Sequence, residues 1–203
     1  LKNALKHVRA AKDGGAQSVK FQVYKAEKIV SQHAKSYWDK KAEKETSQLK
    51  LYRRFDGLTL KDYQKIYIFC KKIKIKFIIT PFDLDSVNFF KNKVDYFKIS
   101  SSDITNYPLI EKISRAKKPI ILSTGASTYK EVGSALKIIE KRNKKITLLH
   151  CILNYPTNKD DANLNMIDDL KNFGYPVGIS DHTKPIESHE VLPMAYIKGV
   201  RVF

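Results

Sequence analysis

The stretch "DYFKISSSDITNYPLIEKISRAKKPIILSTG" (95–125) contains an apolar run, a helical pattern and a second apolar run. The two runs, 95–100 and 118–125, are built around Ile, Leu, Phe and Tyr, and runs of this kind favour strands. Residues 107–116 between them have apolar residues at helical spacing. Because two parallel strands need a crossover connection, usually a helix, the stretch predicts a β-α-β unit.

The same alternation of strand and helix continues in both directions along the chain. Further apolar runs lie at 18–24, 76–82, 146–151, 176–182 and 200–203. Helical patterns lie between the runs, at 59–74, 84–92, 128–142, 164–172 and 187–198. Near-continuously apolar strands that alternate with helices are typical of a parallel sheet covered by helices.

We therefore expect an α/β fold, a TIM (β/α)₈ barrel truncated so that its first strand is missing and its last strand is cut. The chain begins inside an amphipathic helix and ends in the apolar "GVRVF", so residues 1–203 are expected to form one partial barrel domain. A doubly wound open sheet is the alternative. It is less favoured because no glycine-rich phosphate loop follows the first strand.

Residues 25–58 interrupt this rhythm as a long insertion between a strand and a helix. The segment is dense in charge and contains Trp38, the one tryptophan of the chain. Loops of this length are usually functional or mobile.

The composition limits the class of protein. With 203 residues, 42% of them hydrophobic, the chain can bury one sizeable core. No apolar run approaches the roughly 20 residues that span a bilayer, and the Lys-rich start does not resemble a signal peptide. The two cysteines, Cys70 and Cys151, form no CxxC motif, which favours a reduced, cytoplasmic location.

The formal net charge of +17 allows several partners: nucleic acid, anionic lipid or an anionic substrate. The alternative is lysine on solvated helix faces, which we favour because Lys71-Lys72 and Lys144-Lys145 lie where helices are expected to end. No RNA-binding aromatic motif or zinc-finger spacing is present. We expect neither a nucleic-acid partner nor a membrane partner.

Polar residues gather at the predicted carboxyl ends of the strands, where barrels of this kind place their chemistry. They are Lys20, Gln22, Thr80, Asp83, Lys98, Ser100, Ser101, Asp103, Ser123, Thr124, His150, Asn154, Tyr155, Ser180, Asp181 and His182.

Lys20 and Lys98 interrupt apolar strands, in "VKF" and "FKI". Lysine is almost never buried without a partner, so two ammonium groups that converge on an anion would explain both positions. In the alternative interpretation, one or both face outward and extend between helices. Ser101, Ser123 and Ser180 could donate hydrogen bonds to phosphate or carboxylate oxygens, which together predicts a site for a small, multiply charged substrate.

His182 lies in "VGISDHT" (177–183), where an apolar strand becomes polar. In one interpretation Asp181 and Thr183 cap the next helix and His182 is structural. In the other, the strand end presents His182 to a metal or a substrate. One histidine cannot hold a metal, so other ligands would have to come from elsewhere.

Several strings resemble the sialic acid synthase family, which includes the legionaminic and pseudaminic acid synthases. They cover most of the chain in the family's order: "GGAQSVKFQ", "ITPFD", "DYFKISSSDITN", "KPIILSTGAS", "LLHCILNYPT", "DANLNMI" and "VGISDHT". The resemblance implies a TIM-barrel transferase that condenses phosphoenolpyruvate with N-acetylmannosamine or a related N-acetylated hexose. The products are a nine-carbon 2-keto acid and phosphate, and the cofactor is a divalent metal, Mn²⁺ or Mg²⁺.

The resemblance also implies roles for individual residues. Lys20 and Lys98 match the catalytic lysines that hold phosphoenolpyruvate, and His182 matches one of two histidine metal ligands. The expected substrate-binding residues are Gln22, Thr80, Ser101, Ser123, Asn154, Tyr155 and Ser180. Of these, Gln22 and Tyr155 match sugar contacts, while Asn154 is shifted by one from the family's asparagine, which would fall at Leu153.

Other parts of the family pattern lie outside the chain. They are a first strand with a catalytic glutamate, the second metal histidine and a C-terminal antifreeze-like domain. The fragment alone is therefore expected to be inactive, and the full-length protein is expected to be a homodimer. Two rival functions stay open: a Schiff-base aldolase that uses Lys98 or Lys20 as nucleophile, and a basic nucleic-acid-binding domain.

Overall fold

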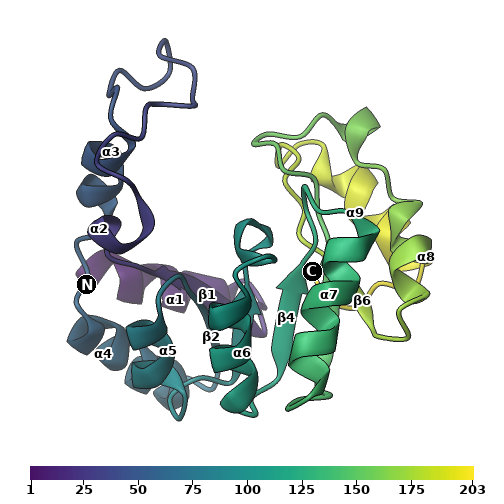
Figure 1. The fold of residues 1–203 in the computed structure, drawn as a ribbon, viewed down its shortest axis with the longest axis horizontal. Coiled ribbons are helices and arrows are strands. Elements are labelled where there is room, and N and C mark those ends of the chain that lie inside the picture. The colour runs from purple at the N-terminus through teal and green to yellow at the C-terminus, as the bar shows by residue number, and fades with distance from the viewer. The chain divides into compact units, whose positions relative to one another are not determined.

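The computed structural model describes residues 1–203 and divides them into two compact units, Leu1–Asp95 and Tyr96–Phe203. The first unit contains α1 (Lys2–Asp13), β1 (Ser18–Val23), α2 (Ala26–Ile29), α3 (Gln48–Phe55), α4 (Leu60–Lys72), β2 (Lys76–Pro81) and α5 (Leu84–Phe90). The second contains β3 (Tyr96–Ile99), η1 (Ser101–Asp103), α6 (Tyr107–Arg115), β4 (Ile120–Ser123), α7 (Tyr129–Glu140), β5 (Ile146–His150), η2 (Lys159–Asp161), α8 (Met166–Lys171), β6 (Val177–Ile179) and α9 (Ser188–Ile197). Figure 1 shows both units.

In the first unit, β1 and β2 pair in parallel, with Lys20 opposite Ile78 and Gln22 opposite Thr80. The rings of Phe77 and Phe90 are fully buried, with their centroids 6.3 Å apart. Helix α4 begins at a capping box, because the Thr59 side chain and the Asp62 carboxylate each bond to the other's backbone N–H.

In the second unit, β3, β4, β5 and β6 pair in parallel in that order. Ile120 and Leu122 of β4 are buried, as is Ile139 on α7. Helix α7 begins, like α4, at a capping box, here formed by Thr128 and Glu131. Parallel strands connected by helices put all four strand carboxyl ends at one edge of this unit.

The predicted alternation of strands and helices is confirmed, and the α/β class with it. All six strands pair in parallel with a neighbour in their own unit, and the predicted helices begin and end within two residues of their predicted bounds. Residues 200–203 were predicted to begin a strand, and this prediction is wrong for the structure. They lie beside β6 but make one backbone hydrogen bond to it, from Ile179 N to Val202 O at 2.9 Å, which is too few for a ladder.

The 25–58 segment is partly ordered by its own contacts. It contains α2 and α3, and Lys35 and Ser47 form an antiparallel bridge. The Trp38 indole N–H donates to the carbonyl oxygens of Glu43 and Glu45, at 3.1 and 3.0 Å. Figure 1 shows this segment extending away from α3 and returning to it.

Candidate active site

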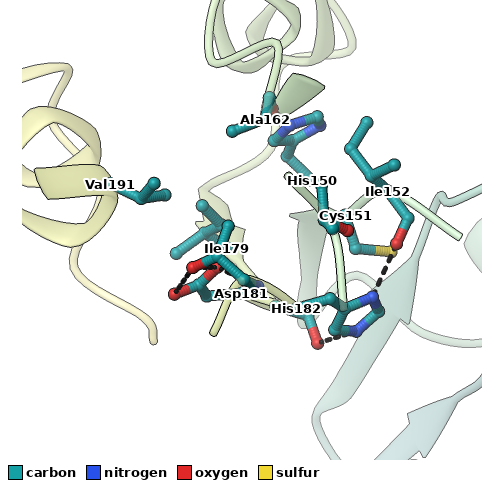
Figure 2. Close-up of a pocket in the computed structure, with 11 residues that line it drawn as sticks. His150, Cys151, Ile152, Ala162, Ile179, Asp181, His182 and Val191 are labelled. Carbon is teal, nitrogen blue, oxygen red and sulfur yellow. Dashed lines mark hydrogen bonds between the residues drawn. The ribbon is translucent and has the colours of Figure 1, made fainter. Parts of the chain in front are cut away.

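The carboxyl ends of β5 and β6 and the residues that follow them line a small pocket (Figure 2). Several of the site residues predicted from the sequence belong to the second unit. Its predicted lysine, serine, tyrosine and histidine residues all lie on strands β3 to β6 or just after one of them. Because these strands are parallel and in register, residues from four separate parts of the sequence are delivered to the same edge of the sheet.

The His182 imidazole is held in one tautomer. Its Nδ1 lies 2.6 Å from the carbonyl oxygen of Ile152, which can only accept a hydrogen bond (Figure 2). Nδ1 therefore carries the proton, and Nε2 of the neutral ring has a lone pair. The hydroxyls of Tyr155 and Ser180 lie 3.0 and 3.2 Å from Nε2 and donate to it. This is the orientation that metal-binding histidines adopt when a carbonyl holds the opposite nitrogen.

Tyr155 also stacks on the imidazole, with ring centroids 4.0 Å apart and an angle of 29° between the planes. Its loop is tied to the loop after β6, because Thr157 N donates to His182 O at 2.8 Å. The Thr157 hydroxyl also donates to Asn154 O at 2.9 Å. Tyr155 is 72% exposed, so its position depends on these few contacts.

Asp181 points away from His182. Its carboxylate accepts hydrogen bonds from the Thr183 backbone and hydroxyl, at 2.9 and 2.8 Å, and from the Ser188 hydroxyl at 2.7 Å. Burial alone would raise the pKa of Asp181, but these hydrogen bonds lower it. The interpretation that Asp181 and Thr183 cap the next helix is wrong for this structure, because the N-cap of α9 is Glu187 and no side chain caps the helix. Asp181 instead accepts from the Ser188 hydroxyl at the start of α9, while Nε2 of His182 accepts from Tyr155 and Ser180.

Ser123 ends β4 and is 2% exposed. Its hydroxyl oxygen is buried and has no hydrogen-bond partner. A buried hydroxyl without a partner is costly unless a ligand or water satisfies it, so Ser123 suits the predicted role as a donor.

Ser101 lies close to the chain that follows β4. A Cβ atom placed on Gly125 would lie 3.3 Å from the Ser101 hydroxyl oxygen and 2.8 Å from the Cys151 sulfur. Only glycine allows the ends of β3, β4 and β5 to approach this closely.

Lys98, on β3, is half-buried, so its expected burial among apolar residues is only partial. Asp103 follows in η1 and was not assigned a role from the sequence. One of its carboxylate oxygens is buried without a partner, and burial raises the pKa of Asp103, against a hydrogen bond from Asn106 that lowers it. The sequence signal was its place directly after a strand end.

The first unit contains Lys20, Gln22 and Thr80. The expectation that Lys20 is buried is wrong for this structure: its side chain is exposed, although partial burial of the ammonium group lowers its pKa. Gln22 is exposed, and its backbone carbonyl accepts from the Tyr63 hydroxyl at 2.9 Å. Thr80 resembles Ser123, being 1% exposed with a buried hydroxyl that has no partner.

Asn154 and His150, two other polar residues of the second unit, differ in their exposure and in their hydrogen bonds. Asn154 is exposed, and no hydrogen bond of its side-chain amide positions it. His150 is 2% exposed, and its Nε2 donates to Ala162 O at 2.7 Å. Burial lowers the pKa of His150, so it serves as a neutral anchor for the following loop.

The chain's own ligands do not complete a metal site. No group of three or more His, Cys, Asp or Glu side chains could hold an ion. His182 nevertheless fits as one ligand of a site that other residues complete, because its unprotonated Nε2 faces the polar edge.

Comparison with known proteins identifies the family of the chain. The model of the NeuB family matches residues 7–203, and the chain belongs to this family. It is 40% identical to an N,N'-diacetyllegionaminic acid synthase of Campylobacter jejuni, over 92% of this chain and 58% of that protein. It is 31% identical to a pseudaminic acid synthase of Helicobacter pylori, over 90% of this chain and 54% of that protein.

Among solved structures, a sialic acid synthetase of Leptospira borgpetersenii in complex with citrate matches with a TM-score of 0.83 and 31% identity. The match covers 98% of this chain and 65% of that one. The chain spans about half the length of the curated relatives it matches. No helix of the structure has both the length and the apolar composition needed to cross a membrane.

Proposed function

We propose that the protein containing this chain is a cytoplasmic, homodimeric nonulosonate synthase, and that the chain forms part of its (β/α)₈ barrel. It condenses phosphoenolpyruvate with N-acetylmannosamine or a related N-acetylated hexose. Membership of the NeuB family supports this reaction class. The structural observation that carries the proposal is His182, whose tautomer is set by Ile152 and whose Nε2 lone pair faces Tyr155 and Ser180.

In the proposed reaction, the third carbon of phosphoenolpyruvate attacks the sugar aldehyde, and a carbon–carbon bond forms. Water adds to the second carbon, and the tetrahedral intermediate loses phosphate as its carbon–oxygen bond breaks. Phosphoenolpyruvate, hexose and water thus become a nine-carbon 2-keto acid and inorganic phosphate.

The residues of this chain bind and orient the two substrates. Lys20 and Lys98 neutralise the phosphate and carboxylate of phosphoenolpyruvate, which positions its third carbon for attack. Ser101, Ser123 and Ser180 donate hydrogen bonds to the same substrate, and the buried Ser123 hydroxyl gains the partner that it otherwise lacks. The remaining substrate contacts are assigned to Gln22, Thr80, Asn154 and Tyr155.

A divalent metal, Mn²⁺ or Mg²⁺, is the proposed cofactor, and His182 is one of its ligands. When bound, such an ion polarises the aldehyde oxygen of the sugar as a Lewis acid. The other ligands come from outside this chain.

The test is to incubate the full-length protein with phosphoenolpyruvate and a panel of sugars, N-acetylmannosamine and a diacetylated 6-deoxy hexose included. Phosphate release and the mass of the product are measured with Mn²⁺, with Mg²⁺ and after chelation. We expect release that requires both a sugar and a metal, and the preferred sugar identifies the pathway. No phosphate release with any sugar would contradict the proposal.

A Schiff-base aldolase is the second candidate, because burial lowers the pKa of Lys20 and the structure gives that ammonium group no hydrogen bond or ion pair. Borohydride reduction in the presence of a keto acid separates the two functions. The synthase leaves no covalent adduct, whereas the aldolase is trapped at Lys20 or Lys98.

A further inference from the structure

The contact between Tyr155 and His182 raises a question about metal binding. In the structure the Tyr155 hydroxyl lies 3.0 Å from Nε2, and the Ser180 hydroxyl lies 3.2 Å from the same atom. The ring of the same residue stacks on the imidazole, with the ring centroids 4.0 Å apart, so Tyr155 contacts His182 through both its hydroxyl and its ring.

We infer that Tyr155 is a positioning residue for His182: its hydroxyl occupies Nε2 until a metal ion displaces it, while its ring holds the imidazole plane. This inference rests on the proposed function, in which His182 is a metal ligand. It assigns opposite effects to the two parts of one side chain. The hydroxyl competes with the ion, and the ring keeps the ligand in place for it.

The surrounding contacts make this separation possible. The Nδ1–H bond to Ile152 O, at 2.6 Å, places the lone pair of the neutral ring on Nε2 whether or not a hydroxyl is nearby. The backbone bond from Thr157 to His182 O, at 2.8 Å, holds the two loops together without the Tyr155 side chain. Removing the hydroxyl therefore leaves the ligand in its tautomer and its loop in place.

Phenylalanine at this position removes the hydroxyl and keeps the stacking ring. In the full-length protein, Tyr155→Phe should bind Mn²⁺ about 2- to 10-fold more tightly than wild type, since one net hydrogen bond no longer has to be broken. Tyr155→Ala, which also loses the ring, should not show this gain. Mn²⁺ alone is titrated, by paramagnetic resonance or calorimetry, without substrates.

A matched control is Tyr129→Phe. Tyr129 is also an exposed tyrosine, and it stacks on Phe173 with ring centroids 4.1 Å apart, away from any histidine. Its Mn²⁺ affinity should equal that of wild type. As a metal-independent readout, ¹H–¹⁵N spectra of the histidine rings in the metal-free protein should show His182 protonated at Nδ1, with the Nε2 shift altered in Tyr155→Phe.

The outcomes distinguish the proposed ligand role of His182 from the positioning role of Tyr155. If His182→Ala binds Mn²⁺ as wild type does, the ligand assignment fails and the inference with it. If His182→Ala loses affinity but Tyr155→Phe binds Mn²⁺ equally or more weakly, only the inference about Tyr155 is overturned. An unchanged Nε2 shift in Tyr155→Phe would also overturn it.

Discussion

His182 Nδ1 donates a hydrogen bond to the carbonyl oxygen of Ile152 at 2.6 Å, between residues 30 positions apart in the sequence. The bond joins the segment after β5 to the segment after β6. It places the lone pair of the neutral imidazole on Nε2, the proposed metal-binding nitrogen, and the first prediction concerns this atom.

Replacing His182 with Ala in the full-length protein should weaken Mn²⁺ binding by about ten- to a hundredfold or more. Even the loss of a residue that only hydrogen-bonds to a metal ligand typically lowers metal affinity by about ten- to a hundredfold. Phosphoenolpyruvate binding should largely survive, since we propose that Lys20 and Lys98 hold this substrate. Mn²⁺ and phosphoenolpyruvate titrations check the two expectations separately. In wild type, Mn²⁺ affinity should also fall with decreasing pH, because protons compete for the imidazole.

Replacing Lys98 with Met should raise the KM for phosphoenolpyruvate and lower kcat/KM at least about tenfold, roughly 1.4 kcal/mol, through lost charge neutralisation. Steady-state kinetics on the full-length enzyme measure this. Lys76→Met is the control, because Lys76 is an exposed lysine at the opposite, amino-terminal end of a strand. Equal kcat/KM in Lys98→Met and wild type would place Lys98 outside the substrate site.

The buried carboxyl of Asp103 predicts a pH-dependent stability. Burial raises its pKa in the folded state, so ionisation disfavours folding. Its contribution is fully present below the pKa of the unfolded state, about 3.9, and is lost as the pH rises through the folded pKa. Asp103→Asn should therefore stabilise the full-length protein at pH 7 and have less effect near pH 4, as measured by urea denaturation.

Asp168→Asn provides the opposite case. Hydrogen bonds from Lys171 and Lys198 lower the pKa of Asp168 to about 2. Its contribution is present above the unfolded pKa and is lost as the pH falls through the folded value. Asp168→Asn should therefore not raise the free energy of unfolding at pH 7. If it raised that free energy as much as Asp103→Asn does, the stabilisation would come from removing any negative charge and not from the burial of Asp103.

Gly125→Ala should destabilise the full-length protein by about 1–3 kcal/mol, because the added carbon would lie 2.8 Å from the Cys151 sulfur. It should also raise the KM for phosphoenolpyruvate, since Ser101 lies on the same side. Combining it with Cys151→Ala should restore part of the stability. Gly57→Ala, where the added carbon meets nothing within 4 Å, should change neither quantity.

Much of the secondary structure could be predicted from the sequence because its causes are local. The apolar strands, the helical spacing and the threonine caps at Thr59 and Thr128 each act within a few residues of chain. The gathering of polar residues at strand ends was also predictable, since parallel strands share a direction. The exposure of Lys20 was not, because burial depends on what covers a strand and not on its immediate neighbours.

The sequence by itself therefore determined the α/β class and which polar residues lie at the strand ends. Only the tertiary structure decided what their side chains do. Asp181 and His182 are adjacent, yet one bonds to Ser188 at the start of α9 and the other to Ile152 after β5. The physical reason is that a side chain's hydrogen-bond partner is set by which strand ends and loops are brought together, and this depends on strand pairing between segments distant in the chain.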